Sequence, residues 1–265
     1  MSISVHRDVV YARRNGFRPL ALDLYVPSGA GTLCVYLHGG GWRMGSRREG
    51  PGPAASWFFE EVASLGLAVA SVEYRLSGEA VFPAQLEDVQ AALRFLQESR
   101  QSYGIASDRI VAWGTSAGGQ LAALAALSPG SPIAAAVCWY PPTDFDALAK
   151  DIEEAGGAGD RSAGSREGQL IGAGLDERPD LAAAASPVDH VHREAPPFLL
   201  LHGTADLAVP PRQSARLASA LTAVGASATV ELIPGATHMF PELDEPAARE
   251  VVRRSVAFLS PPHAP

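Results

Sequence analysis

The chain has 265 residues, of which 47% are hydrophobic, and its formal net charge is -8. This length and composition suit a folded α/β domain rather than a disordered chain, and the acidic excess argues against a nucleic acid or a membrane surface as partner. No signal peptide and no membrane-spanning run are predicted. The two cysteines, Cys34 and Cys138, each lie in an apolar run, where we expect buried free thiols and hence a cytoplasmic location.

Short apolar strands alternate with helices in the first half of the chain. Residues 9–14 and 20–27 alternate loosely around the turn signal Asn15-Gly16, which predicts a hairpin at the edge of a sheet. Continuous apolar runs predict strands that are covered on both faces, and apolar residues at three- and four-residue spacing predict helices. The further elements predicted here are strands at 33–37 and 67–72, helices at 56–65 and from Pro83 to Leu96, and a strand–turn–helix unit at 109–127.

The second half continues the same alternation after an interruption. Residues 143–195 are rich in Gly, Ala, Ser and charge, and we expect an insertion with one or two short helices that covers the site as a small cap, with a solvated loop as the alternative. The elements predicted around it are strands at 133–140, 197–201 and 229–233 and helices at 211–224 and 246–259. The whole pattern predicts one α/β domain over 1–265, with a mostly parallel sheet, helices on both faces, and ligands beyond the carboxyl ends of the strands.

The unit at 109–127 contains the sequence Gly114-Thr115-Ser116-Ala117-Gly118. A sharp strand-to-helix turn projects its middle residue into open space, and glycines on both sides of that residue keep Cβ atoms out of the crowded bend. The helix that follows points its N-terminus, with free N–H groups, at charge that develops beside Ser116. The spacing therefore predicts Ser116 as a nucleophile.

A serine nucleophile needs an imidazole base, and the imidazole needs an acid that fixes its tautomer. Asp206 follows the predicted strand at 197–201, and His238 follows the last predicted strand. Both then lie at the same edge of the sheet as Ser116, which predicts a catalytic triad of these three residues. Asp144 and Asp189 are the alternatives for the acid.

The other six histidines fit the role of base less well. His6 and His263 are terminal, His190 and His192 lie in the interrupted segment, and His38 and His202 are expected to hold neighbouring backbone. No group of His, Cys, Asp and Glu has metal-ligand spacing, so neither a metal nor another cofactor is implied.

A glycine-rich stretch, His38-Gly39-Gly40-Gly41-Trp42, follows the predicted strand at 33–37. Consecutive glycines let backbone N–H groups turn toward a carbonyl oxygen that becomes an oxyanion, and the N–H of Ala117 completes such a hole. Trp42, the bulky residue that ends the stretch, is expected to line the entrance and to contact an aromatic substrate.

These motifs carry a resemblance to a known family over roughly residues 20–260. They are His38 to Trp42, Glu73-Tyr74-Arg75-Leu76, Phe82-Pro83-Ala84, Gly114 to Gly119 and His202 to Pro210. With them the chain resembles the α/β-hydrolase esterases of the hormone-sensitive-lipase-like group, especially its small bacterial members. The resemblance implies that Gly40 and Gly41 donate the oxyanion hydrogen bonds with Ala117, and that Glu73, Tyr74 and Arg75 are structural.

The predicted function is that of a serine carboxylesterase that cleaves small esters through a covalent acyl-enzyme. Larger members of the group carry extra cap helices before the first strand, and the 143–195 segment offers few large apolar side chains, so we expect short acyl chains to be preferred. An aryl formamidase, as in the similar kynurenine formamidases, and a thioesterase are the catalytic alternatives. A non-catalytic ligand-binding protein on the same fold is the alternative from another class, and a homodimer is compatible with the sequence.

Overall fold

The structure is a computed structural model that describes residues 2–260 of the chain. In this part of the chain, eight strands form one sheet in the order β1-β2-β4-β3-β5-β6-β7-β8. The strands are β1 (Ile3–Ala12), β2 (Leu20–Pro27), β3 (Thr32–Leu37), β4 (Leu67–Val72), β5 (Ile110–Thr115), β6 (Ile133–Trp139), β7 (Phe198–Gly203) and β8 (Ala228–Ile233). The strands from β4 across to β8 are parallel to one another, whereas β2 runs antiparallel to both β1 and β4.

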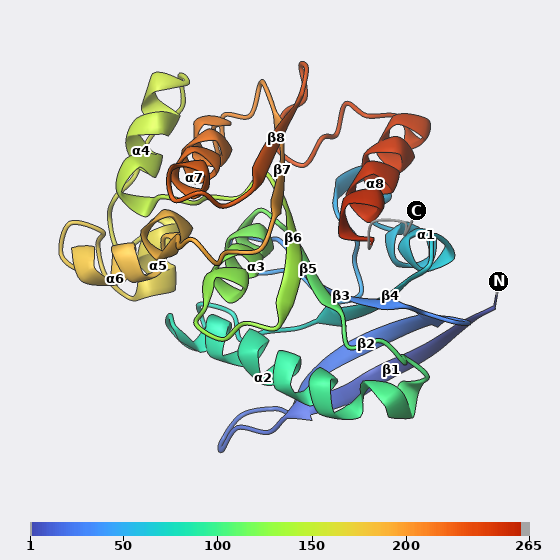
Figure 1. Cartoon of the computed structure of the whole chain (residues 1–265). Coiled ribbons are helices and arrows are strands. Elements are labelled where there is room, and N and C mark those ends of the chain that lie inside the picture. The colour runs from blue at the N-terminus through green and yellow to red at the C-terminus, as the bar shows by residue number, and fades with distance from the viewer. Residues whose placement is uncertain (1, 261–265) are drawn as a thin grey trace.

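Helices cover both faces of this sheet (Figure 1). They are α1 (Phe58–Ser64), α2 (Ala84–Ser99), α3 (Ala117–Leu127), α4 (Phe145–Glu154), α5 (Arg166–Ile171), α6 (Pro179–Ala184), α7 (Arg212–Ala223) and α8 (Glu245–Leu259). Short 3-10 turns lie at η1 (Gly52–Ala54), η2 (Arg100–Tyr103) and η3 (Pro187–His190). The predicted fold class, a mostly parallel sheet between helices in the α/β-hydrolase arrangement, is confirmed.

Each inner strand supplies both of the two cores. In β3, Leu33, Val35 and Leu37 belong to the core beneath α2, α3 and α7, whereas Cys34 and Tyr36 belong to the core beneath α1 and α8. Successive side chains of a strand point to opposite faces, so an inner strand with helices on both sides needs an unbroken apolar run. Cys34 and Cys138 are free and buried in this sheet, as predicted.

The edge of the sheet and the 143–195 segment differ from the sequence prediction. The first strand begins at Ile3 rather than at residue 9, and its pairing with β2 shifts register between His6 and Val9. The segment contains three short helices, α4, α5 and α6, where one or two were expected (Figure 1). Two of them begin at capping side chains, since Asp144 accepts the N–H of Ala147 and Ser165 accepts the N–H of Gly168.

None of the helices within residues 2–260 is both long enough and apolar enough to cross a membrane.

Candidate active site

Ser116 lies at the turn between β5 and α3, at the carboxyl edge of the parallel strands. Its backbone has φ 52° and ψ −121°, a conformation that a residue with a side chain rarely adopts. Its N–H donates to the carbonyl oxygen of Trp139 at 2.9 Å, which fixes the turn to the end of β6. The strained turn holds the hydroxyl beyond the edge of the sheet, where it is half-buried.

The glycines on either side of Ser116 are required by close approach of the backbone. A Cβ at Gly114 would lie 2.0 Å from the carbonyl oxygen of Gly118, and a Cβ at Gly118 would lie 2.1 Å from that of Leu37. Neither separation is compatible with a real side chain, so the G-x-S-x-G spacing follows from the packing of this turn against β3.

The structure brings Ser116, His238 and Asp206 into one chain of hydrogen bonds. The Oγ atom of Ser116 lies 3.0 Å from Nε2 of His238, and Nδ1 of His238 lies 2.6 Å from Oδ2 of Asp206. The three side chains come from loops after β5, β8 and β7, as the order of the motifs in the sequence suggests. The two alternatives for the acid lie elsewhere: Asp144 caps α4, and Asp189 lies in η3.

Asp206 is buried and held as a carboxylate. Its Oδ1 accepts the N–H groups of Ala208 and Val209, both at 2.9 Å. Burial alone would raise its pKa, but hydrogen bonds from His202 and His238 outweigh that effect and hold the pKa of Asp206 well below its usual range. His202 is itself fully buried between Ser214 and the carbonyl oxygen of Val209.

The loops that carry Asp206 and His238 meet at Gly203. The N–H of Ala205 donates to the carbonyl oxygen of Ala236 at 3.0 Å, which ties the two loops together. A Cβ at Gly203 would lie 2.2 Å from that same oxygen. The absence of a side chain at Gly203 therefore sets the distance between the two loops.

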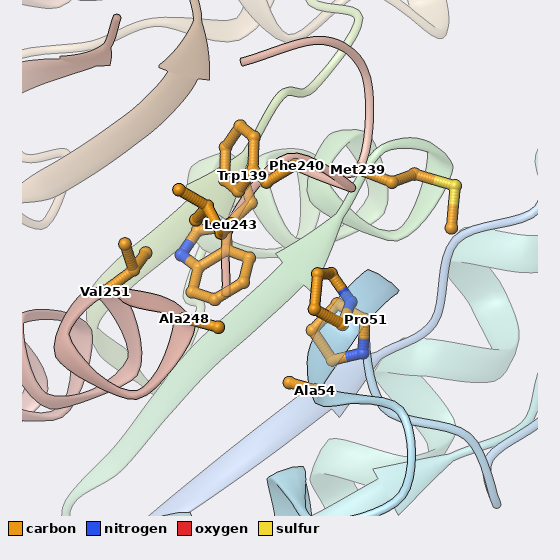
Figure 2. Close-up of a pocket in the computed structure, with 9 residues that line it drawn as sticks. Pro51, Ala54, Trp139, Met239, Phe240, Leu243, Ala248 and Val251 are labelled. Carbon is orange, nitrogen blue, oxygen red and sulfur yellow. The ribbon is translucent and has the colours of Figure 1, made fainter. Parts of the chain in front are cut away.

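Phe240, two residues after His238, is buried among other aromatic side chains, whereas Met239 is exposed. Met239 and Phe240 both have positive φ, 71° and 58°, so the chain turns sharply behind the imidazole. The ring of Phe240 contacts Tyr140 and Trp139, and Tyr140 meets His238 edge to face at 4.7 Å. Figure 2 shows a cavity between Trp139, Phe240, α8 and the Pro51 loop; its volume of about 10 Å³ leaves room for no more than one water molecule.

The glycine loop, defined here as residues 38–48, follows β3 and contains Gly40 and Gly41. Their φ angles are 115° and 59°, and within residues 2–260 their N–H groups have no hydrogen-bond acceptor. Ala117 begins α3, so its N–H also has no acceptor within the helix. Three backbone donors are thus available in the two segments that meet at Ser116.

His38 opens the glycine loop without titrating in the neutral range. Its ring stacks on Tyr74 at 4.4 Å, its Nδ1 lies 2.8 Å from the carbonyl oxygen of Gly39, and its own carbonyl oxygen accepts the hydroxyl of Tyr74. Burial lowers the pKa of His38 to about 4. The neutral ring therefore fixes the start of the loop through its contacts with Tyr74 and with the backbone of Gly39.

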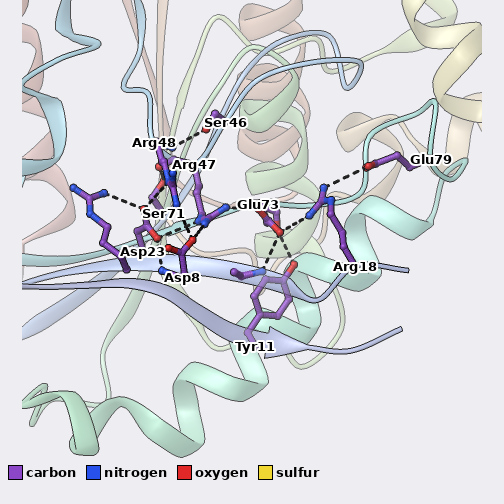
Figure 3. Close-up of polar contacts among 12 residues, drawn as sticks. Asp8, Tyr11, Arg18, Asp23, Ser46, Arg47, Arg48, Ser71, Glu73 and Glu79 are labelled. Carbon is purple, nitrogen blue, oxygen red and sulfur yellow. Dashed lines mark hydrogen bonds and ion pairs between the residues drawn. The ribbon is translucent and has the colours of Figure 1, made fainter. Parts of the chain in front are cut away.

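The other end of the glycine loop is anchored by Arg47 (Figure 3). Its guanidinium donates to Asp23 of β2 at 3.1 Å and also contacts Glu73 and Asp8. Its carbonyl oxygen accepts the hydroxyl of Ser71 at 2.6 Å. Sequence reasoning missed this residue, because its three carboxylate partners lie far from it in the chain.

Trp42 corrects a sequence prediction. It was expected to line the entrance and to contact substrate, but only 1% of the residue is exposed. Its indole N–H donates to Oε1 of Gln120 at 3.1 Å, and its ring packs on Phe145. With φ at 57°, the backbone of Trp42 turns this large side chain into the core, where it fixes the glycine loop against α3 and α4.

An open cavity of about 390 Å³ lies beside the glycine loop. Its wall combines Arg43 of that loop, parts of residues 152–167, and Leu207 and Ala208, which directly follow Asp206. Arg166 of α5 reaches over the loop, since a Cβ at Gly41 would lie 3.1 Å from its Cδ. Nothing in the sequence around Arg166 signals this position.

A metal site is not formed by the described residues: across 2–260, no group of three or more His, Cys, Asp or Glu side chains is arranged to hold an ion. Among the remaining histidines, His190 and His192 lie in η3 and just after it, and His263 lies outside the described residues.

A serine at a strained strand-to-helix turn, with an acid and a histidine after later strands of a mostly parallel sheet, defines an α/β-hydrolase. A family model described as BD-FAE matches residues 22–221, and the chain belongs to this family. The predicted place among the α/β-hydrolase esterases is thereby confirmed.

Individual relatives agree with this assignment. The chain is 32% identical over 237 residues to esterase LipQ of Mycobacterium tuberculosis, an alignment that covers 85% of this chain and 55% of that relative. A carbohydrate esterase from gut microbiota superposes with a TM-score of 0.82 at 26% identity, over 97% of this chain and 96% of that one. Esterase Est2 of Thermogutta terrifontis has the same fold, with a TM-score of 0.73 at 23% identity, over 97% of this chain and 91% of that one.

Proposed function

We propose that this protein is a serine esterase that hydrolyses esters of short-chain carboxylic acids through a covalent acyl-enzyme. The observation that carries the proposal is the unbroken chain of hydrogen bonds from Asp206 through His238 to Ser116, at 2.6 and 3.0 Å. Such a chain lets a hydroxyl lose its proton as it attacks, which a lone serine does not do at neutral pH.

In the first half of the reaction, Oγ of Ser116 attacks the ester carbonyl carbon while Nε2 of His238 takes the hydroxyl proton. The carboxylate of Asp206 accepts the hydrogen bond of Nδ1–H and stabilises the imidazolium that forms. His238 then gives its proton to the leaving alcohol as the bond between the carbonyl carbon and the alcohol oxygen breaks. In the second half, water attacks the acyl carbon while Nε2 of His238 takes a proton from the water. His238 then gives that proton to Oγ of Ser116 as the bond between Oγ and the acyl carbon breaks, and the carboxylic acid is released.

The N–H groups of Gly40, Gly41 and Ala117 are proposed to hold the oxyanion that forms in each half. Two features support this role: none of the three groups is used inside the described chain, and Ala117 directly follows the nucleophile. Donors that are fixed before the reaction stabilise the developing charge without reorganisation.

The preference for short acyl chains rests on the wall beside the glycine loop. The cavity there is lined by Arg43, Asp160, Arg166 and Glu167 as well as by smaller apolar groups. A methylene group contributes about 0.8 kcal/mol only when it moves from water into apolar surroundings, and charged side chains do not provide them. Est2, which shares this fold, has been solved with propionate and with butyrate bound, and both are short acids.

The 143–195 segment is proposed to be the cap of a single domain. Its helices supply Ser165, Arg166 and Glu167 to the cavity wall, and Gln120 of α3 donates to the carbonyl oxygen of Ala185 at 2.6 Å. The aryl formamidase alternative, which is based on similarity to the kynurenine formamidases, loses the added support of Trp42 as an exposed aromatic contact.

Covalent labelling tests the reaction class. A fluorophosphonate should label the protein once, on Ser116, and Ser116→Ala should abolish labelling and lower kcat by roughly a factor of 10⁴–10⁶. Peptide mapping by mass spectrometry identifies the labelled residue. Labelling at another serine, or a fully active Ser116→Ala variant, would contradict the proposed mechanism.

A chain-length series tests the substrate class. With p-nitrophenyl esters at fixed pH, kcat/KM should be highest for acetyl to butyryl groups and should fall by octanoyl, because further methylenes stay in contact with water. A maximum at decanoyl or longer would show that the segment forms an apolar acyl site, and the proposed preference would be wrong.

A further inference from the structure

The cavity beside the glycine loop adjoins the reacting groups without containing them. Ser116 and His238 do not line it, but the side chain of Arg166 lies against Gly41, a proposed oxyanion donor. Ala208, which also lines the cavity, donates its N–H to the carboxylate of Asp206. A substrate whose carbonyl group lies at Gly41 therefore has its next few atoms within reach of this cavity.

Two guanidinium groups on the cavity wall are unused by the protein. Within residues 2–260, neither Arg43 nor Arg166 makes a side-chain hydrogen bond or an ion pair. Arginines nearby in the chain differ, since Arg47 contacts three carboxylates and Arg161 contacts two. A guanidinium offers five N–H donors in a planar fork that matches a carboxylate, so two unused forks in the lining of one cavity form an anion-binding arrangement.

The two acidic residues on the same wall do not fill that arrangement. The carboxylate of Asp160 accepts the N–H of Ser162 at 2.8 Å, within a local turn. Glu167 lies close enough for Arg166 and Arg43 to affect it, but it forms no ion pair with either among the described residues. Burial raises the pKa of Glu167, so this side chain takes up a proton more readily when a second negative charge arrives.

We propose that Arg43 and Arg166 bind a carboxylate of the substrate, so that the preferred esters carry a negative charge near the scissile bond. This inference rests on the proposed esterase function and narrows its substrate class. Two charge-assisted contacts in the lining of this open cavity give the substrate a fixed orientation, which a short neutral acyl group alone does not provide.

The experiment compares esters of similar size with and without a carboxylate, on either side of the scissile bond. For the acyl side the pair is monoethyl succinate and ethyl butyrate, followed by acid release in a pH-stat. For the alcohol side the pair is 4-acetoxybenzoate and 4-acetoxybenzamide, followed by phenol absorbance. In at least one pair, kcat/KM should favour the charged ester by about tenfold, the effect of one hydrogen bond to a charged group.

Substitutions assign that preference to residues. Arg43→Gln and Arg166→Gln should each lower kcat/KM for the charged ester by about tenfold and leave the neutral ester within about twofold. Glu167→Gln should strengthen the preference, because it removes a competing negative charge. Arg94→Gln, at an exposed position of α2, removes the same charge away from the cavity and should not change kcat/KM for either ester.

The outcomes separate this inference from the proposed function. Equal rates for charged and neutral esters in both pairs, or equal losses for both esters in the arginine variants, would overturn the carboxylate site while leaving an esterase. If neither the neutral nor the charged esters are hydrolysed, and no fluorophosphonate label appears, the esterase function itself fails. The neutral-ester rate of each variant also reports whether that variant is folded.

Discussion

The two sides of the candidate site are held in place by different kinds of interaction. The glycine loop is anchored by buried polar groups: Asp23 is fully buried, and the Arg47 side chain is only 12% exposed. The outer part of the 143–195 segment is held by Arg161, whose partners Asp146 and Asp176 have side chains that are 89% and 73% exposed. Breaking a buried ion pair lowers the free energy of unfolding strongly, whereas breaking an exposed pair lowers it little.

This difference suggests that one segment serves the chemical step and the other serves substrate selection. The segment with buried anchors holds Gly40 and Gly41, two of the three proposed oxyanion donors, whose positions must be fixed within a fraction of an ångström. The segment with exposed pairs holds Arg166, which is proposed to bind the substrate carboxylate. We therefore expect substitutions in the anchored part to change the chemical step, and those in the outer segment to change substrate preference or nothing at all.

The largest effect is expected for Asp206→Asn. The asparagine carbonyl can still accept the N–H groups of Ala208 and Val209, but its amide presents a donor to Nδ1 of His238 and stabilises the wrong tautomer. Activity should fall by roughly 10⁴-fold in a folded protein. Asp144→Asn and Asp189→Asn are the matched controls. If either control lost as much activity while Asp206→Asn stayed active, the assignment of Asp206 as the acid would be wrong.

The loss of stability caused by Asp206→Asn should depend on pH. The pKa of Asp206 lies below its ordinary value of 3.8 in the folded protein, so the ionised carboxylate stabilises the fold above that value, and the contribution is lost as the pH falls through the folded pKa. Urea unfolding should show a deficit for Asp206→Asn at pH 7 that narrows below pH 3.8. A deficit that grows in acid would contradict the lowered pKa.

A smaller loss of activity than for Asp206→Asn is expected for Arg47→Met. Asp23 still pairs with Arg7, and Glu73 still pairs with Arg18. The contacts that join these two carboxylates to the glycine loop are lost. The free energy of unfolding should fall by about 3 kcal/mol. In the fraction that remains folded, kcat should fall by roughly 10–100-fold with a smaller change in KM, because displaced donors weaken transition-state binding.

Arg48 provides the control for that variant. It neighbours Arg47 in the chain and contacts Asp8 at 2.8 Å, but its side chain is 56% exposed. Arg48→Gln should leave kcat within about twofold and the free energy of unfolding within about 1 kcal/mol. Equal effects of the two substitutions would show that burial of the anchor does not matter.

The smallest effect is expected for Arg161→Gln in the outer segment. Its ion pairs with Asp146 and Asp176 are exposed, so the free energy of unfolding should change by no more than about 1 kcal/mol, and kcat for acetyl esters by less than about twofold. Thermal melts and steady-state kinetics measure both quantities. A loss as large as that of Arg47→Met would remove the distinction between the two sides.

The sequence predicted the inner sheet well because its signals are local. Strands such as β3 and β5 are buried on both faces and therefore read as unbroken apolar runs. Ser116 could be singled out because it directly follows such a run, and Asp206 and His238 because each lies a few residues after a strand that ends at the same edge of the sheet. Their roles remain part of the proposed function, which the variants above test.

The remaining features depend on contacts between distant residues. The three helices at 143–195 are short and lack a long apolar period of their own, and two of them begin at the capping residues Asp144 and Ser165. The orientation of Trp42 depends on a backbone turn and on Gln120, 78 positions along the chain. The start of β1 was missed because its polar residues His6, Arg7 and Asp8 coincide with a shift in register.

The conformation of Ser116 places stability and activity in conflict at a single position. A residue with a side chain in such a backbone conformation costs about 1–3 kcal/mol, and glycine adopts it freely. Selection or engineering that rewards only resistance to unfolding would therefore replace the proposed nucleophile itself. A screen for more stable variants of this protein therefore has to measure catalytic turnover as well. A screen for stability alone would favour Ser116→Gly, which removes the hydroxyl.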